Sequence, residues 1–179
     1  MFPRNSPKSL CVQEDYPLRK VLIFGNSGSG KSTLAKRLVK EESLVHLDLD
    51  SLAWLPETPP KRASLEESRM ILEEFISSNN CWVIEGGYTD LLEMAAPIAN
   101  EVIFMNLDVS QCIENAKNRP WESHKYKSKE AQDCNLDMLI NWIGQYMERD
   151  DVFSFRSHTE FYKEFTGKKL MRTTNESHT

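Results

Sequence analysis

Residues 20–38 read KVLIFGNSGSGKSTLAKRL, and this stretch decides the fold class. Its centre, residues 25–32, matches the Walker A pattern G-x-x-x-x-G-K-S, in which a glycine-rich loop joins a strand to a helix and binds phosphate. The apolar run at 21–24 is typical of a buried parallel strand. Apolar residues return at helical spacing after the loop, at positions 34, 35, 38 and 39. The sequence therefore predicts a strand, a phosphate-binding loop (P-loop) and a helix in succession.

The chemistry of such a loop follows from its backbone. Successive N–H groups form a concave anion site, and the following helix adds free N–H groups and the positive end of its dipole. Lys31 is expected to reach the β- and γ-phosphates of ATP, and the Ser32 hydroxyl to reach Mg²⁺. The residues predicted to contact the nucleotide are Gly25, Asn26, Ser27, Gly28, Ser29, Gly30, Lys31, Ser32 and Thr33.

The chain has 179 residues and a net charge of −5, from 22 basic and 27 acidic side chains. This length suits one domain, and the absence of a long apolar run argues against a membrane-spanning helix. An acidic chain is not built to coat nucleic acid, so a nucleic-acid partner is not expected. The first twenty residues have no apolar run, so a secretory signal is not expected, and the spacing of cysteines and histidines does not predict a metal site. Scattered cysteines suit a reducing cytoplasm, where we expect the protein to act.

The rest of the chain alternates predicted strands and helices. Residues 1–19 hold three prolines and no apolar period, which predicts a flexible N-terminal extension before a single domain at 20–179. A loop is expected at 55–63. Further strands are expected at 45–50, 82–85, 101–108 and 168–173. This alternation predicts an α/β three-layer fold around a parallel sheet.

Two serines predict helix starts. Ser64-x-x-Glu67 and Ser157-x-x-Glu160 both match a capping box, and Gly167 suits the position just after the end of the second helix. The apolar face of the first helix is expected to hold Leu65, Leu72, Phe75 and Ile76.

Two acidic segments and a basic one follow the P-loop. Residues 49–54 read LDSLAW, residues 82–88 read WVIEGGY, and residues 117–129 hold five Lys or Arg with one Glu. In this order the chain resembles the short P-loop kinases, which include nucleoside monophosphate, shikimate and gluconate kinases. It is most similar to small adenylate-kinase-like proteins known as topology modulation proteins. The resemblance covers residues 20–174 and implies a five-stranded parallel sheet of order 2-3-1-4-5 with a short basic lid at about 117–133.

The resemblance also implies Mg-ATP-dependent transfer of the γ-phosphate to a small-molecule acceptor. Ser32, Asp48 and Glu85 would serve Mg²⁺. Asp50 would face the acceptor hydroxyl as a base or orienting group, since that hydroxyl must be aligned with the γ-phosphate. The implied catalytic residues are Lys31, Asp50 and Arg119, the last because a guanidinium grips phosphate bidentately. The implied acceptor-site residues are Asp50, Trp54, Gly86, Gly87 and Tyr88.

The acceptor itself stays open. Nucleotide kinases usually continue the acidic-glycine segment with Phe-Pro-Arg, and this chain has Gly87-Tyr88-Thr89. Shikimate kinases have three glycines there, and this chain has two. The alternative is a nucleotide-binding regulatory ATPase that acts on a protein or nucleic-acid partner, and a third reading is a kinase of nucleic-acid ends. Monomer and homodimer are equally compatible with the sequence.

Overall fold

The computed structural model describes residues 18–56, 61–123 and 126–175. The extension predicted at 1–19 therefore lies outside the described residues, except for Leu18 and Arg19. Arg19 forms ion pairs with Glu42 at the end of the helix at 31–42 and with Glu101 at the start of the strand at 101–105, which tie this point of the chain to the folded domain.

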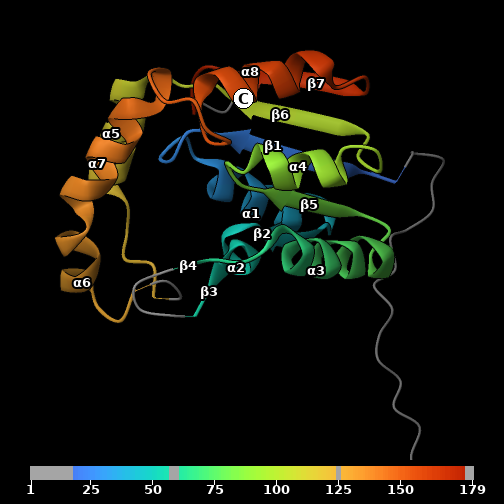
Figure 1. Ribbon diagram of the computed structural model, residues 1–179, viewed down its shortest axis with the longest axis horizontal. Helices are drawn as coiled ribbons and strands as arrows, with labels where there is room; N and C mark the ends of the chain where they lie inside the picture. Colours follow the sequence, from blue (N-terminus) through green and yellow to red (C-terminus); the bar gives the residue numbers. More distant parts are fainter. Residues whose placement is uncertain (1–17, 57–60, 124–125, 176–179) are drawn as a thin grey trace, which may run out of the picture.

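Five parallel strands form the central sheet (Figure 1). They are β1 (Lys20–Gly25), β2 (Val45–Asp48), β5 (Trp82–Glu85), β6 (Glu101–Met105) and β7 (Lys168–Arg172). Their spatial order is β2-β5-β1-β6-β7. Numbered within the sheet alone, this is 2-3-1-4-5, as predicted. The strand that carries the P-loop therefore lies at the centre, with its carboxyl end open to ligands.

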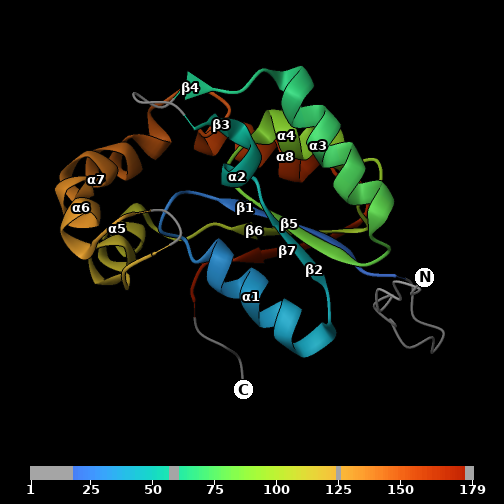
Figure 2. The same ribbon diagram turned by 90° about the horizontal axis from the view of Figure 1, so that it is seen from below.

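Helices cover both faces of the sheet (Figure 2). They are α1 (Lys31–Glu42), α2 (Asp50–Ala53), α3 (Leu65–Ser78), α4 (Thr89–Ala95), α5 (Val109–Asn118), α6 (Lys129–Cys134), α7 (Leu136–Gly144), the 3₁₀ turn η1 (Gln145–Met147) and α8 (Phe155–Glu164). Along β1, Val21 and Ile23 pack into the core under α1, while Leu22 and Phe24 pack on the opposite side against α3, α4 and α8. This gives the three layers predicted from the alternation of elements.

A short hairpin lies between α2 and α3, where the sequence predicted only a loop. Its strands are β3 (Trp54–Leu55) and β4 (Lys61–Arg62), and Trp54 pairs with Arg62. The predicted strand at 45–50 also ends early, at Asp48, because α2 begins at Asp50. Of the residues predicted for the apolar face of α3, Leu65 is exposed, whereas Leu72 is buried.

The second predicted capping box, at Ser157-x-x-Glu160, is wrong. Helix α8 begins after Ser154, whose side chain accepts the Ser157 N–H, so Ser157 lies inside the first turn. Gly167 is also misplaced, since α8 ends at Glu164 and Phe165 is its cap. By contrast, Ser64 caps α3 with the predicted box. In the described ranges, no helix is both long and apolar enough to cross a bilayer.

Candidate active site

The P-loop has the backbone that its glycines predict. Gly25, Gly28 and Gly30 all have positive φ, which side-chain-bearing residues rarely adopt. At Gly28 a Cβ would lie 2.3 Å from the Cys112 carbonyl oxygen, so α5 can approach only because this residue is glycine. Lys31 Nζ donates to the Asn26 carbonyl oxygen at 2.7 Å, which holds the ammonium against the loop.

Side-chain amides hold the outer side of this loop. Asn115 Nδ2 donates to the Gly28 carbonyl at 2.8 Å, and Asn175 Nδ2 donates to the Ser29 carbonyl at 2.9 Å. Asn115 and Asn175 also hydrogen-bond to each other at 2.8 Å. Neither amide could be predicted from the sequence, because each lies far along the chain from the loop. With two of its carbonyls engaged by these amides, the loop is braced before any phosphate binds.

The predicted Mg²⁺ residues meet at the end of β2 and β5. Asp48 and Glu85 are register partners on these strands, and the Ser32 hydroxyl hydrogen-bonds to Glu85. Burial alone would raise the pKa of Glu85, but His46, whose Nε2 lies 3.4 Å from Glu85 Oε1, and the nearby Lys31 ammonium hold that pKa below its usual value. Glu85 is therefore ionised at neutral pH although it is buried.

These oxygen groups fit Mg²⁺, which binds proteins through one or two carboxylates together with substrate phosphates and water. Among the described residues, no group of three or more His, Cys, Asp or Glu could hold a metal alone. Asp48 has a second task, since its Oδ1 accepts the Asp50 N–H at 2.9 Å and so shapes the turn into α2. The fit is thus to a metal that arrives with a nucleotide.

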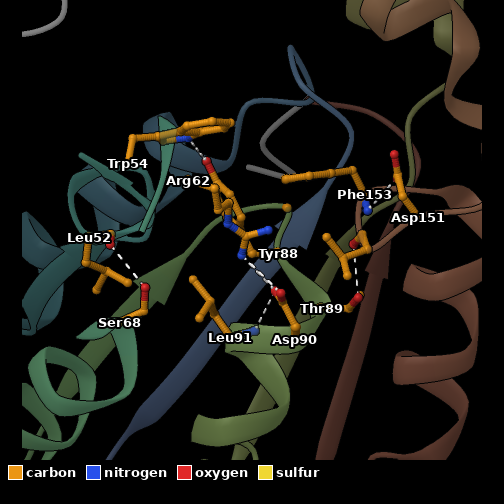
Figure 3. Close-up of polar contacts among 12 residues, drawn as sticks. Leu52, Trp54, Arg62, Ser68, Tyr88, Thr89, Asp90, Leu91, Asp151 and Phe153 are labelled. Carbon is orange, nitrogen blue, oxygen red and sulfur yellow. Dashed lines mark hydrogen bonds and ion pairs between the residues drawn. The ribbon is translucent and has the colours of Figure 1, made fainter. Parts of the chain in front are cut away.

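Three predicted acceptor-site residues form one hydrogen-bonded chain. Trp54 Nε1 donates to Tyr88 Oη at 2.7 Å, and the Tyr88 hydroxyl donates to Asp50 Oδ1 at 2.5 Å (Figure 3 shows the Trp54–Tyr88 bond). Burial and the Asp50 charge both raise the pKa of Tyr88, so its proton stays on the phenol. Tyr88 therefore remains a donor that orients the Asp50 carboxylate, and Trp54 fixes the direction of that donor.

We expect Tyr88→Phe to lower the turnover of phosphoryl transfer by about tenfold, the effect of losing one hydrogen bond to a charged group. ATP affinity should be unchanged, since Tyr88 contacts Asp50 and not the P-loop lysine. Steady-state kinetics with a stimulating acceptor measures both. Tyr162→Phe on α8 removes the same atom elsewhere and should have no effect. Equal loss in both variants would contradict an orienting role for Tyr88.

Two cavities meet at the reactive end of the P-loop. The larger, about 530 Å³, lies along the P-loop and α5 and includes Arg119, Arg172 and Asn175 in its lining. The smaller, about 180 Å³, lies between the P-loop and the aromatic residues Trp54, Tyr88, Trp142 and Phe153. Both are lined by Ser27, Lys31 and Asp50. The two cavities therefore adjoin each other at Ser27, Lys31 and Asp50.

Arg119 lies where the predicted lid begins and faces the larger cavity. Its Nη1 donates to Glu122 at 3.1 Å. Its Nε and Nη2 are buried and have no hydrogen-bond partner within the described part of the chain. Buried N–H groups of a guanidinium are costly to leave unpaired, so this side chain is suited to an anion.

The glycine pair has two different roles. Gly87 lines the smaller cavity, and its carbonyl accepts a hydrogen bond from His158. Gly86 lines neither cavity, because it packs against Leu49, and a Cβ there would lie 2.8 Å from Leu49 Cβ. Of the predicted acceptor-site glycines, the structure places only Gly87 at the cavity.

His158 is a site residue that the sequence analysis missed. It is fully buried on α8, its Nε2 donates to the Gly87 carbonyl at 2.8 Å, and its Nδ1 accepts from the Tyr146 hydroxyl at 2.7 Å. Burial, together with the Lys31 charge, lowers its pKa to about 4. His158 is therefore neutral at pH 7, and its hydrogen bond to the Gly87 carbonyl holds the backbone that lines the smaller cavity.

This histidine should make the protein less stable in mild acid. Its folded pKa is depressed, so the unfolded chain binds more protons between about pH 6.5 and pH 4, and the free energy of unfolding falls as pH falls through that window. The expected loss from pH 7.5 to pH 5 is about 2 kcal/mol from this residue alone. Urea denaturation at both pH values measures it. His158→Gln cannot titrate and should show a flatter pH dependence; an equal slope would contradict the assignment.

A family model described as an AAA domain matches residues 21–136, which is more than half of the chain. The matched stretch contains Lys31, Asp50 and Arg119. A curated relative, described as uncharacterized protein YqaC of Bacillus subtilis (strain 168), is 27% identical over 106 residues. That alignment spans 59% of this chain and 59% of the relative.

Solved structures share the fold over most of its length. A shikimate kinase from Bacteroides thetaiotaomicron has a TM-score of 0.54 at 18% identity, with 90% of this chain and 89% of that chain covered. A gluconokinase from Sinorhizobium meliloti 1021 has a TM-score of 0.50 at 13% identity, with 92% and 86% covered. The architecture is thus the shikimate kinase-like P-loop fold. The nearer resemblance to topology modulation proteins remains a prediction.

Proposed function

This chain belongs to the AAA domain family, and from that premise and the geometry of its site we propose that it is an ATP- and Mg²⁺-dependent phosphotransferase acting on a small molecule. One observation carries the proposal. The large cavity beside the P-loop and the small aromatic cavity meet at Lys31 and Asp50. A nucleotide in the first and a hydroxyl compound in the second would bring donor and acceptor together there.

The residues at the junction suit in-line transfer. The acceptor hydroxyl oxygen forms the new bond to the γ-phosphorus, the bond from that phosphorus to the bridging oxygen breaks, and ADP leaves. The hydroxyl proton passes to the Asp50 carboxylate, which Tyr88 holds in place. Lys31 stabilises charge on the transferring group from the P-loop side, and Arg119 does so from the lid.

Ser32 and Glu85 would hold Mg²⁺, with Asp48 acting through water, and the ion would neutralise charge on the nucleotide phosphates. The ionised state of buried Glu85 supports this assignment. We further propose that residues 20–179 act as one domain and that residues 117–133 are a lid that excludes water during transfer.

The test is consumption of ATP with Mg²⁺, screened against pooled small molecules that carry hydroxyl groups. A pool that raises turnover well above the rate without acceptor supports a small-molecule kinase, and the same stimulation must vanish in Lys31→Ala. Slow turnover that no pool stimulates, with ATP binding intact, would contradict the proposal and favour the regulatory ATPase.

A further inference from the structure

We infer that the acceptor carries no negative charge: the aromatic cavity beside Asp50 takes an uncharged or cationic hydroxyl compound with an apolar ring face, and rejects carboxylates and phosphorylated acceptors. This inference rests on the proposed kinase function and names the substrate class for it.

Four aromatic side chains, Trp54, Tyr88, Trp142 and Phe153, line one side of the 180 Å³ cavity. The Tyr88 and Phe153 rings meet edge to face with centroids 4.8 Å apart, and Phe153 meets Trp142 in the same way at 5.5 Å. Trp54 completes the wall through its hydrogen bond to Tyr88. Ring faces of this kind attract the apolar face of a ring compound or a positive charge, and their negative quadrupole disfavours an anion.

The charges in this cavity also disfavour an anion. Lys31 and Asp50 are the charged residues among the described residues that line it. Lys31 is held on the loop by the Asn26 carbonyl and is assigned to the nucleotide phosphates. His158 has both ring nitrogens engaged by Gly87 and Tyr146 and is neutral at pH 7. A carboxylate on the acceptor would therefore meet the Asp50 charge with no cation left to balance it.

Two arginines lie near the aromatic wall, yet neither guanidinium lines the cavity. Arg62 on β4 donates to both Asp90 oxygens, at 3.0 and 3.1 Å, and its Cζ lies 4.9 Å from the Tyr88 ring centroid. Figure 3 shows Arg62 directed toward Asp90 at the start of α4. The second arginine, Arg149, forms an ion pair with Asp151.

Arg149 Nη2 lies 2.6 Å from Asp151 Oδ2, and its Cζ lies 3.3 Å from the Trp142 ring centroid. Each guanidinium is thus neutralised by its own carboxylate and covered by a ring of the wall. An acid-binding site needs a guanidinium that reaches the ligand, and neither of these two lines the cavity.

The size of the cavity limits the acceptor to a compact molecule. Its volume is about 180 Å³. Sites that enclose drug-sized ligands have roughly 300–1,000 Å³. A single hydroxylated ring, such as a monosaccharide or an amino sugar, is the size class that remains.

The experiment compares acceptors that share one skeleton and differ in charge. One set is a hexose, its uronic acid and its amino sugar. A second is cyclohexane-1,2-diol, 2-hydroxycyclohexanecarboxylate and 2-aminocyclohexanol, and compounds found in the pooled screen extend both. The readout is formation of the phosphorylated product with Mg-ATP. We expect the uncharged and cationic members to be better substrates than the acid by at least about tenfold in kcat/KM.

A variant tests the role of the neutralised arginine. Asp90→Asn leaves Arg62 without its counter-charge, so the preference for uncharged over acidic acceptors should shrink several-fold. Asp150→Asn makes the same change in an exposed pair with Arg156 on α8 and should leave the preference unchanged. ATP affinity, measured in both variants, shows that each is folded. An unchanged preference in Asp90→Asn would overturn the role assigned to the Arg62–Asp90 pair.

Two results would overturn the inference, and they differ. If the acid of a set is phosphorylated as well as its uncharged partner, the inference fails while the kinase function stands. If no member of any set is phosphorylated although ATP binds, the proposed function fails and the inference falls with it.

Discussion

Lys31→Met is expected to lower ATP-dependent phosphoryl transfer by about a thousandfold, the upper range for loss of one group that stabilises transferring charge. The methionine keeps the unbranched shape of the side chain but removes the ammonium that now lies against the Asn26 carbonyl. Lys31 lines both cavities, and among the described residues no other positively charged side chain lines both. Product formation with a stimulating acceptor measures the loss.

Lys36→Met is the matched control for this prediction. It makes the same change on an exposed position of the same helix, α1, and should leave transfer and ATP affinity unchanged. If Lys31→Met retains more than about a tenth of the transfer rate, Lys31 does not stabilise the transferring phosphate.

Asp50→Asn is expected to lower transfer by about 10² to 10⁴-fold, the range for removing a general base. An asparagine can still accept the Tyr88 hydroxyl hydrogen bond, so the wall of the cavity should remain in place. ATP affinity should be unchanged or raised, since the variant removes a negative charge near the phosphates. Kinetics of transfer, combined with equilibrium binding of ATP, separates the two effects.

Asp137→Asn controls for the loss of one negative charge, because Asp137 is exposed on α7. It should leave both quantities unchanged. Transfer at the wild-type rate in Asp50→Asn would show that Asp50 takes no part in the reaction. The junction of the cavities would then have no proton acceptor.

Local sequence was sufficient to predict the P-loop and the individual strands of the sheet. The loop conformation depends on glycines at 25, 28 and 30, and the strand before it depends on four apolar residues, all within one short stretch. The strand order was also predicted, but through resemblance. Nothing in the periodicity of five separate strands specifies which of them are neighbours.

The acceptor side was predicted only in part. The resemblance placed Asp50, Trp54 and Tyr88 in one acceptor site, but the hydrogen-bonded chain among them was not predicted. Arg62 was read as part of a loop because a two-residue strand beside prolines has no detectable period. In the sequence, His158 looks like an ordinary polar residue of a helix. It becomes buried and reaches the Gly87 carbonyl only when α8 packs on the sheet.

The error at Ser157 has a simple cause. Serines at 154 and 157 are one turn apart, and only the latter has glutamate three residues on. The pattern favoured Ser157. In the structure the helix begins one turn earlier, after Ser154, and the Asp151 side chain accepts the Phe153 N–H in the turn before it. Capping motifs identify helix starts only to within about one turn.

The Asn175 amide that braces the P-loop comes from 146 residues further along the chain than its partner, Ser29. The loop itself is among the first parts of the domain to leave the ribosome. Its brace is made 146 residues after Ser29, and the β7 strand just before that brace is also made long after the loop. A nascent chain can therefore display the complete P-loop sequence and still lack the braced loop, so tight nucleotide binding should begin only after synthesis has passed Asn175.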